Sequence, residues 1–279
     1  MKDIVIIYHG DCLDGFGGAW AAYKKFGDSA DYIPGYYDNT FFEGLENKEI
    51  YFIDFMYSAE VTKELVSKNR KVTAIDHHLS TSERVKLTNS YSYSIENSGS
   101  VLAWKYFHQD IPTPKMLEYI EDRDLWRFKF KETLAACYFI DSFDFNFDVW
   151  DKLVKDFDSK EEVREHMSKG EAIVKYNQRM INRVIKEGAK LVSFEGFEAY
   201  AVNANQLFVS QIGAVLYERK PPIAIIWSED KNFVKVSLRS NGTVDVSKIA
   251  EKFGGGGHWA SAGFRLLAIG SFPWKEKNV

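Results

Sequence analysis

The first half of the chain alternates between short apolar runs and longer segments in which apolar residues recur every three or four positions. The runs at 3–8, 49–53 and 72–75 are rich in β-branched residues, which is typical of buried parallel strands. The first run is followed by apolar residues at helical spacing: Phe16, Ala19, Trp20, Tyr23 and Phe26. This alternation predicts an α/β domain with a mostly parallel sheet and helices on both faces.

A second set of elements is predicted after a long helical segment. This segment has an interrupted apolar face and ends at Gly188, so we expect a helix that connects two domains. The pattern beyond it predicts a helix near 209–218 and strands at 190–194, 198–202, 223–227 and 233–238. We therefore expect an N-terminal domain at 1–157, a connector helix at 158–187 and a smaller α/β domain at 188–279.

Polar side chains follow three of the predicted strands. The first strand leads to His9, Asp11 and Asp14, the second to Asp54, and the third to Asp76, His77 and His78. Ligands in open α/β sheets gather at the carboxyl ends of the strands, so we expect these side chains to converge. The alternatives are a Gly/Asp turn with a solvated His in the first segment and a polar turn at the triplet. Because three strands end in this way, a functional site is favoured over separate coincidences.

Asp54 ends an apolar run and is followed by Phe55, so its carboxylate needs a cation or several hydrogen-bond donors. A helix N-cap is the alternative role, but Ser58 is better placed to cap the helix predicted at 59–69. Two further helices are predicted, one starting at 98–100 and one starting at Pro114. The Ser-rich start of the first is most often a cap, although its backbone donors also suit phosphate.

Two more carboxylates, Asp122 and Asp124, flank Arg123 at the end of the helix that starts at Pro114. One of them could reach a metal while Arg123 pairs with the other. A solvated surface turn is the alternative for this segment.

The last domain contains four consecutive glycines followed by His258. One or two glycines suffice for a turn, so this run is expected to let a ligand lie against backbone amides. The residues expected to bind an anionic substrate are Gly255, Gly256, Gly257, His258 and Arg239. It is not a Walker loop, because no Lys-Ser or Lys-Thr follows. A flexible linker is the alternative, but an ordered apolar pattern resumes at Trp259.

Composition narrows the class of protein. With 279 residues, 45% hydrophobic and 27% charged, the chain is that of an ordinary globular protein with no stretch able to span a bilayer. A net charge of −4 argues against coating long nucleic acid. The default compartment is the cytoplasm. Two cysteines are too few for a disulfide framework or a thiolate cage, so any metal is expected to use His and carboxylates.

The Asp76-His77-His78 triplet, with Gly254 to His258 and the preceding segment 237–240, resembles the DHH phosphoesterase superfamily, specifically its members with a C-terminal DHHA1 domain. The resemblance covers nearly the whole chain. It implies a two-domain enzyme that uses two divalent cations, usually manganese, to hydrolyse phosphoester or phosphoanhydride bonds. The substrates of such enzymes are short oligonucleotides, nucleotide bisphosphates, cyclic dinucleotides or polyphosphate.

The resemblance also implies residue roles. The usual first motif places a His four and six residues before two Asp, whereas the steps from His9 to Asp11 and Asp14 are two and five. The implied metal ligands are His9, Asp11, Asp14, Asp54 as the bridging carboxylate, His77 and Asp122, with Asp124 as the alternative to the last. Asp76 is expected to orient His77, and His78 to contact the scissile phosphate.

Oxygen and imidazole ligands suit manganese, with magnesium as an option. Two such ions per site activate a water for in-line attack on phosphorus, so no protein nucleophile is required. With Arg239 and the glycines holding the far phosphate, the resemblance favours cleavage from an end of a short oligonucleotide or small nucleotide. The alternatives are a polyphosphate hydrolase and a catalytically silent nucleotide-binding protein; a dimer is one option for the assembly.

Overall fold

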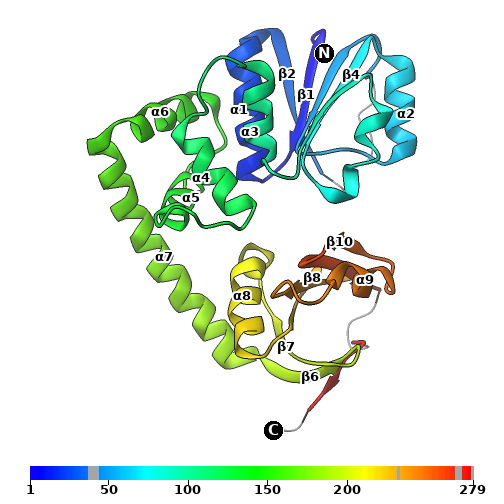
Figure 1. Ribbon diagram of the computed structural model, residues 1–279, viewed down its shortest axis with the longest axis vertical. Helices are drawn as coiled ribbons and strands as arrows, with labels where there is room; N and C mark the ends of the chain where they lie inside the picture. The colour runs from blue at the N-terminus through cyan, green and yellow to red at the C-terminus, as the bar shows by residue number, and fades with distance from the viewer. Residues whose placement is uncertain (37–43, 231–232, 268–271, 278–279) are drawn as a thin grey trace. The chain divides into compact units, whose positions relative to one another are not determined.

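The computed structural model describes residues 1–36, 44–230, 233–267 and 272–277. The chain divides into two compact units, residues 1–174 and 175–279. Helix α7 (Lys160–Gly188) passes from the first unit into the second (Figure 1). The expected divisions at 157 and 187 stay predictions. Within the described ranges, no helix combines the length and the apolar character needed to cross a membrane.

The first unit is built on a five-stranded sheet whose neighbouring strands are all parallel. Its strands are β1 (Ile4–His9), β2 (Ala30–Gly35), β3 (Glu49–Ile53), β4 (Lys71–Asp76) and β5 (Ser90–Tyr93), in the order β2-β1-β3-β4-β5. The direction of the strand order therefore changes between β1 and β3. Such a switch point is where open α/β sheets bind ligands, at the carboxyl ends of the strands.

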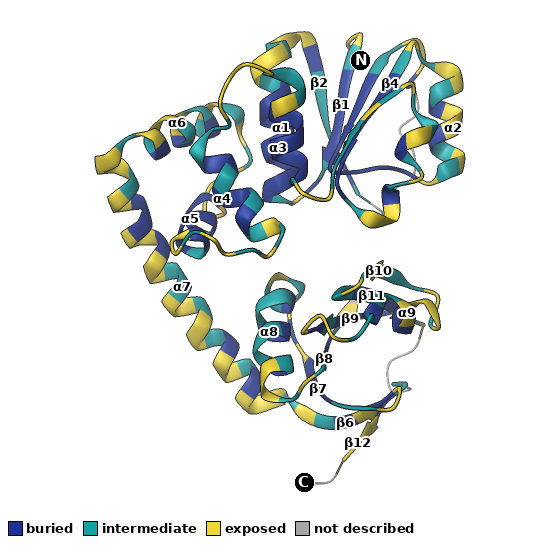
Figure 2. Ribbon diagram, in the orientation of Figure 1, coloured by how far each residue is buried: buried dark blue, intermediate teal, exposed yellow. Residues whose placement is uncertain are grey.

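Helices cover both faces of this sheet (Figures 1 and 2). Helices α1 (Leu13–Phe26) and α3 (Gly99–Phe107) pack on the face that carries Ile6, Ile53 and Ile75. Helix α2 (Ala59–Lys68) packs on the other face, against Phe52 and Ala74. Successive strand residues point to opposite faces, and both sets are apolar, as expected of a sheet buried on both sides. The expected α/β class is confirmed.

Three more helices extend the side of α1 and α3: α4 (Lys115–Asp124), α5 (Thr133–Ile140) and α6 (Phe147–Asp158). Neither α5 nor α6 is predicted by the sequence pattern. The signals for α6 are its cap, since the Asn146 side chain accepts from the amides of Asp148 and Val149, and a buried stripe of Trp150, Leu153 and Phe157. Short 3-10 helices lie at Gly27–Ser29, Leu79–Thr81, Val85–Leu87 and Gln206–Phe208.

The second unit contains a mixed, seven-stranded sheet in the order β10-β11-β9-β8-β7-β6-β12. Its strands are β6 (Lys190–Phe194), β7 (Phe197–Asn203), β8 (Ile223–Asp230), β9 (Phe233–Ser240), β10 (Gly256–His258), β11 (Ser261–Leu266) and β12 (Lys275–Glu276). Among the described strands of this unit, β7 and β8 pair in parallel and the other neighbours are antiparallel. Helices α8 (Val209–Arg219) and α9 (Val246–Glu251) pack on opposite faces, in separate apolar clusters.

Candidate active site

Neighbouring strands deliver the predicted polar residues to one edge of the parallel sheet. His9 is the last residue of β1, Asp54 follows β3, and Asp76 ends β4 directly before His77 and His78. Because β1, β3 and β4 are adjacent, these side chains meet at the switch point of the strand order. Loops and helix ends then add Asp14, from the first turn of α1, and Asp124, the last residue of α4.

Asp54 lies at the centre of this group and is only 1% exposed. Its Oδ2 is 3.3 Å from Nδ1 of His9, while its Oδ1 is 3.1 Å from Nε2 of His77. The two oxygens of one carboxylate therefore face two different histidines. Its φ of +56° is a left-handed conformation that Asp tolerates better than most residues. An added Cβ at Gly99 would lie 2.6 Å from the Cβ of Asp54, so the first position of α3 needs glycine.

Two sets of potential ligand atoms meet at Asp54, which belongs to the first set and contacts His77 of the second. One set is His9, Cys12 and Asp54, and the other is Asp14, His77 and Asp124, with the ligand atoms of each set within 4.8 Å of one another. In the second set, Nε2 of His77 is 3.9 Å from Oδ2 of Asp14 and 3.5 Å from Oδ2 of Asp124. The sheet edge thus holds two adjoining groups with N, O and S donors, which the shared carboxylate connects.

The electrostatics of the two groups show an excess of negative charge. Burial and the charge of Asp54 raise the pKa of Asp14. Desolvation and the charge of Asp14 raise the pKa of Asp124 to about 8, although 28% of its side chain reaches solvent. Burial disfavours the charged form of His77, but its bond to Asp54 and the charges of Asp124 and Asp14 outweigh this and raise its pKa to about 10. A proton on His77 therefore supplies the positive charge that a bound cation would otherwise provide.

Asp54 itself is the exception, because burial raises its pKa but the bonds from His77 and His9 have the larger combined effect and lower it. Burial and three nearby carboxylates, with Asp54 the strongest, raise the pKa of Cys12 well above its usual value. A charged carboxylate between two imidazoles, surrounded by groups that resist ionisation, is an environment that divalent cations stabilise. The donor set therefore fits divalent cations.

The Asp76 carboxylate bonds the ring of His78 and not the ring of His77. Its Oδ1 accepts from Nδ1 of His78 at 2.8 Å and from the backbone amides of His77 and His78 at 2.7 and 3.1 Å. The expected contact from Asp76 to the ring of His77 is replaced by that ring's bond to Asp54. Because Nδ1 of His78 donates to Asp76, Nε2 is the nitrogen of that ring which could contact a phosphate.

The start of α3 is occupied by a side chain of the same site. Gly99 N donates to Oδ2 of Asp14 at 2.6 Å, and Ser100 donates to Oδ1 through both its amide (3.0 Å) and its hydroxyl (2.6 Å). The backbone donors that the sequence offers for a cap or a phosphate therefore cap the helix with Asp14. Oδ2 of Asp14 also lies 3.9 Å from Nε2 of His77.

Asp122 has a different place from the one expected. Its carboxylate accepts from the amides of Lys129 and Phe130, at 2.9 and 3.1 Å, and from the hydroxyl of Thr133. It therefore fixes the chain between α4 and α5, while Asp124 is the carboxylate next to His77. We accordingly assign the role expected of Asp122 to Asp124. The guanidinium of Arg123 lies over the ring of Tyr138 at 5.3 Å, whereas the sequence suggested a pair with one of the two Asp.

Asp11 is also outside the two groups. It has a φ of +53°, and its carboxylate accepts from the hydroxyl of Tyr36 at 3.4 Å. Cys12 lies where Asp11 was expected, with its Sγ 3.9 Å from Oδ2 of Asp54. The candidate ligands thus include a thiol besides the His and carboxylates that the sequence predicts. The signal was present in the sequence, because Cys12 precedes Asp14 by two residues, the separation of the two Asp in the usual motif.

In the second unit, strand register places Arg239 and His258 on the same face of the sheet. Arg239 lies opposite Ala224 and Ser261, and Ser261 lies opposite His258. Directly opposed residues in antiparallel strands point to the same face, here the one that carries α8. Helix α8 packs on β7, β8 and β9. Arg239, Ser261 and His258 thus form a row across β9, β11 and β10.

Arg239 is a half-buried guanidinium, and its pKa is lowered to about 10 by burial. It donates to the carbonyl of Leu238 at 3.0 Å and to the hydroxyl of Ser210 at 3.4 Å. No carboxylate lies within ion-pair distance of it in the part of the chain that the structure describes. A desolvated positive charge without an acidic partner favours an anionic ligand.

The four glycines have separate physical reasons. An added Cβ at Gly255 would lie 2.1 Å from the carbonyl oxygen of Gly263, and one at Gly257 would lie 2.5 Å from Cα of Ala262. These two are required by the close approach of β11, and Gly254 has a φ of +75°. Added Cβ atoms at Gly254 and Gly256 would both meet open space, but Gly256 has no left-handed φ that would strain another residue there. A cavity of about 430 Å³ borders Gly254, Gly255 and Gly256, with Lys235 and Arg265 in its lining.

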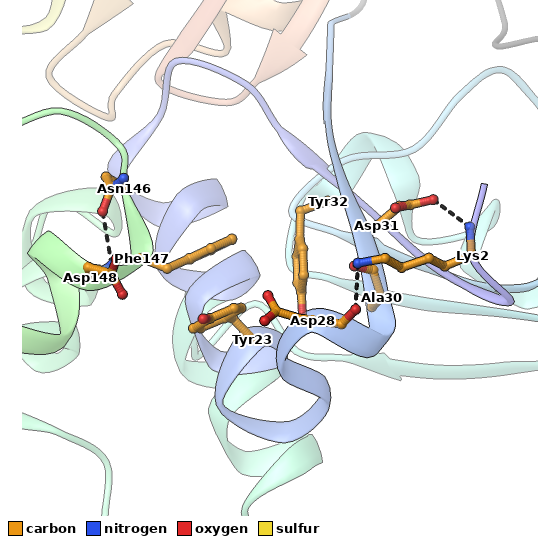
Figure 3. A pocket seen from close by; sticks show the side chains of 9 residues that line it. All are labelled: Lys2, Tyr23, Asp28, Ala30, Asp31, Tyr32, Asn146, Phe147 and Asp148. Atoms are coloured by element: carbon orange, nitrogen blue, oxygen red, sulfur yellow. Dashed lines mark hydrogen bonds between the residues drawn. The ribbon is translucent and has the colours of Figure 1, made fainter.

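A second cavity lies in the first unit, away from the residues at the carboxyl ends of the strands. It has a volume of about 390 Å³ and lies beside Lys2, Ala30 and Tyr32, at the amino ends of β1 and β2 (Figure 3). Its polar groups are already paired in part, because the amide of Lys2 donates to Asp31 and its ammonium to the carbonyl of Asp28. The cavity lies at the amino ends of these strands, the sheet edge opposite to His9 and Asp54.

Comparison with known proteins agrees with this architecture. Residues 199–271 match the DHHA1 domain. An uncharacterized protein, R106, of Acanthamoeba polyphaga mimivirus is 29% identical over 300 residues, covering 98% of this chain and 70% of the relative.

Two solved structures share the fold across both units. A pGpG-specific phosphodiesterase, PggH, from Vibrio cholerae has a TM-score of 0.51 at 12% identity, over 95% of this chain and 94% of its own. An exopolyphosphatase-related protein from Bacteroides fragilis has a TM-score of 0.51 at 16% identity, over 96% of this chain and 88% of its own. The chain thus carries a DHHA1 domain and shares its fold with these two proteins.

Proposed function

We propose that this protein is a phosphoesterase that depends on two divalent cations, manganese with magnesium as an option. The observation that carries the proposal is the position of Asp54, whose two oxygens face His9 on one side and His77 on the other. A single carboxylate shared by two ligand groups is the arrangement that two-cation phosphoesterases need. It also gives a role to a buried charge that would otherwise lower stability.

The proposed ligands are His9, Cys12 and Asp54 for one cation, and Asp14, Asp54, His77 and Asp124 for the other. When bound, the cations supply Lewis acidity that activates water and neutralises charge on the phosphate. Asp76 holds the ring of His78 through Nδ1. We propose that His78 uses its other nitrogen to stabilise charge that develops on the phosphoryl oxygens.

The second unit is proposed to bind an anionic group of the same substrate. Its support is the row of Arg239, Ser261 and His258 beside the open position at Gly256. A site that binds a terminal phosphate would favour substrates that are recognised from an end. We therefore propose a short oligonucleotide or a small nucleotide as the substrate, cleaved as by a 3′–5′ exonuclease or a bisphosphate nucleotide phosphatase.

The fold is shared with a protein described as a pGpG-specific phosphodiesterase and with one described as exopolyphosphatase-related. The first description supports a short nucleotide. Polyphosphate is the second candidate, because Lys235 and Arg265 line the cavity beside the glycines and could contact successive phosphates.

The function is tested with the purified full chain and Mn²⁺ on a panel of substrates, with products separated by chromatography. The panel contains a short oligoribonucleotide, a matched oligodeoxynucleotide, pGpG, adenosine bisphosphate, a cyclic dinucleotide and polyphosphate. We expect hydrolysis of a short nucleotide from one end, and loss of activity when a chelator is added. The Asp54→Asn variant, purified in parallel, controls for contaminating nucleases. Internal cleavage of the oligonucleotide, or no turnover of any substrate, would contradict the proposal.

The role of the second unit is tested with Arg239→Gln on whichever substrate is hydrolysed. We expect KM to rise about tenfold with kcat nearly unchanged, because the lost contact binds ground state and transition state alike. Lys248→Gln, a change on α9 at the opposite face of the sheet, serves as the matched loss of one positive charge. Equal KM values for the two variants would remove Arg239 from the substrate site.

A further inference from the structure

Cys12 introduces sulfur into one of the two ligand groups. It is the N-cap residue of α1, but its side chain makes no capping bond. Its Sγ faces Oδ2 of Asp54, the same oxygen that faces Nδ1 of His9. The three ligand atoms lie within 4.8 Å of one another, which is close enough for one ion to contact all three.

The neighbouring group has a different composition. Asp14, His77 and Asp124 offer two carboxylates and an imidazole, and no thiol belongs to that set. Carboxylates suit hard cations such as Mg²⁺ and Mn²⁺, whereas a thiolate favours Zn²⁺, Co²⁺ and Fe²⁺. The two groups therefore differ in chemical softness although they share Asp54.

We propose that Cys12 is a metal ligand and that it makes the His9–Cys12–Asp54 group selective for a thiophilic divalent cation. The neighbouring group then takes the harder ion, so that the working site holds two different metals. This inference rests on the proposed two-cation function. It assigns to Cys12 the discrimination between metals, a property that the usual Asp at this place would not confer.

Cobalt spectroscopy can test this proposal, because the chain has one other cysteine and that residue belongs to neither ligand group. Cys137 is fully buried in α5, and its thiol contacts the carbonyl of Tyr119 at 3.3 Å. A Cys137→Ala variant of the full chain retains Cys12 as its sole thiol. Titration of this variant with Co²⁺ is expected to produce a sulfur-to-cobalt charge-transfer band in the near ultraviolet. Adding Cys12→Ser is expected to abolish the band.

A second measurement covers the case in which the serine variant folds poorly. Cys12→Asp restores an anionic ligand but makes it hard, and its folding is checked by circular dichroism. In competition between Zn²⁺ and Mn²⁺, followed by calorimetry, the preference for Zn²⁺ is expected to fall by at least about tenfold relative to the parent. An unchanged preference would overturn the inference.

The outcomes separate this inference from the proposed function. No cobalt band in Cys137→Ala, or a band that persists after Cys12→Ser, would overturn the role of Cys12 even if the protein hydrolyses phosphoesters. A band that depends on Cys12 would support it even if no substrate in the panel were turned over. In that second case the proposed hydrolysis alone would fail.

Discussion

The sheet edge of the first unit is built in the opposite way to the glycine strand of the second, by which we mean Gly254–Gly257 at the start of β10. At the sheet edge, chemistry comes from side chains that adjacent strand ends direct toward Asp54. In the glycine strand, side chains are absent, and β11 approaches so closely that Gly255 and Gly257 leave no room for a Cβ. An anion bound there, as proposed, would contact the backbone and the neighbouring Arg239 and His258.

This difference teaches how far a residue type identifies its own role. A buried Asp between two His has few explanations besides charge stabilisation, so its purpose follows from its chemistry. A glycine serves equally for packing, for a left-handed turn or for ligand access, and close packing, a left-handed φ and an open position all occur within four consecutive residues here. Substitution of the shared carboxylate should therefore affect chemistry, whereas substitution of the closely packed glycines should mainly affect folding.

The largest effect is expected for Asp54→Asn. Asparagine keeps the shape and tolerates the left-handed backbone, but it removes the charge shared by the two ligand groups. Hydrolysis should fall by at least about a hundredfold, with binding of both cations weakened. Enzyme assays and calorimetry with Mn²⁺ measure the two effects. If Asp54→Asn weakened only one of two binding events, the shared role of this carboxylate would be incorrect.

The next effect separates Asp124 from Asp122. Asp124→Ala should weaken Mn²⁺ binding about ten- to a hundredfold and leave stability nearly unchanged. Asp122→Ala should leave the cation sites intact but lower the free energy of unfolding by about 3 kcal/mol, since two amides and the hydroxyl of Thr133 lose their acceptor. Calorimetry and urea unfolding of both variants give the comparison. The reverse pattern would return the ligand role to Asp122.

A third effect concerns pH and is confined to the sheet edge. Without a cation His77 has a pKa of about 10, so at neutral pH it carries a proton that must leave before Nε2 can bind a metal. The apparent affinity for Mn²⁺ should therefore rise by about tenfold per pH unit below that pKa. Asp124, with a pKa of about 8, adds to this dependence.

Calorimetry between about pH 6.5 and 8.5, repeated in buffers of different ionisation enthalpy, counts the protons released. Binding that is independent of pH and releases no proton would mean that His77 is not displaced by the ion. Arg239 stays charged across this range, so the second unit should show no corresponding change.

The smallest effect on chemistry is expected in the glycine strand. Gly256→Ala places a methyl group in open space, so it should fold normally and weaken substrate binding by only a few-fold. Gly255→Ala forces the methyl group against the carbonyl of Gly263 and should lower stability by about 2–3 kcal/mol. Thermal unfolding and KM measurements distinguish the two. If Gly256→Ala left KM unchanged, the glycine strand would be a packing device alone.

The sequence predicts the main elements well where pattern and punctuation agree. The bounds of β3 and β6 coincide with the predicted runs, and Ser58 caps α2 as expected, accepting from the amide of Val61. Strand β2 is missed because Pro34 and polar residues interrupt its apolar pattern, which an edge strand tolerates. Helix α5 is missed because it is apolar almost all round.

The candidate site is predicted in part, for a physical reason. Strand ends fix where His9, Asp54 and His77 lie, so alternation alone brings them together. Asp122 and Asp124 are two residues apart on a helix, and spacing cannot tell which one faces the sheet. Cys12 is missed because two cysteines are too few for a thiolate cage, whereas a single thiol can still join His and carboxylate in a mixed group.

Asp14 joins the sheet edge to helix α3 in a way that offers an observable besides catalysis. The amides of Gly99 and Ser100 donate to its two oxygens; Oδ1 also accepts from the hydroxyl of Ser100, whereas Oδ2 keeps a lone pair and lies 3.9 Å from Nε2 of His77. A positive ion drawn to that lone pair would compete for the same electron density as the helix amide. Hydrogen exchange at the Gly99 amide should therefore register occupancy of the site, without any substrate and without a label on the side chains.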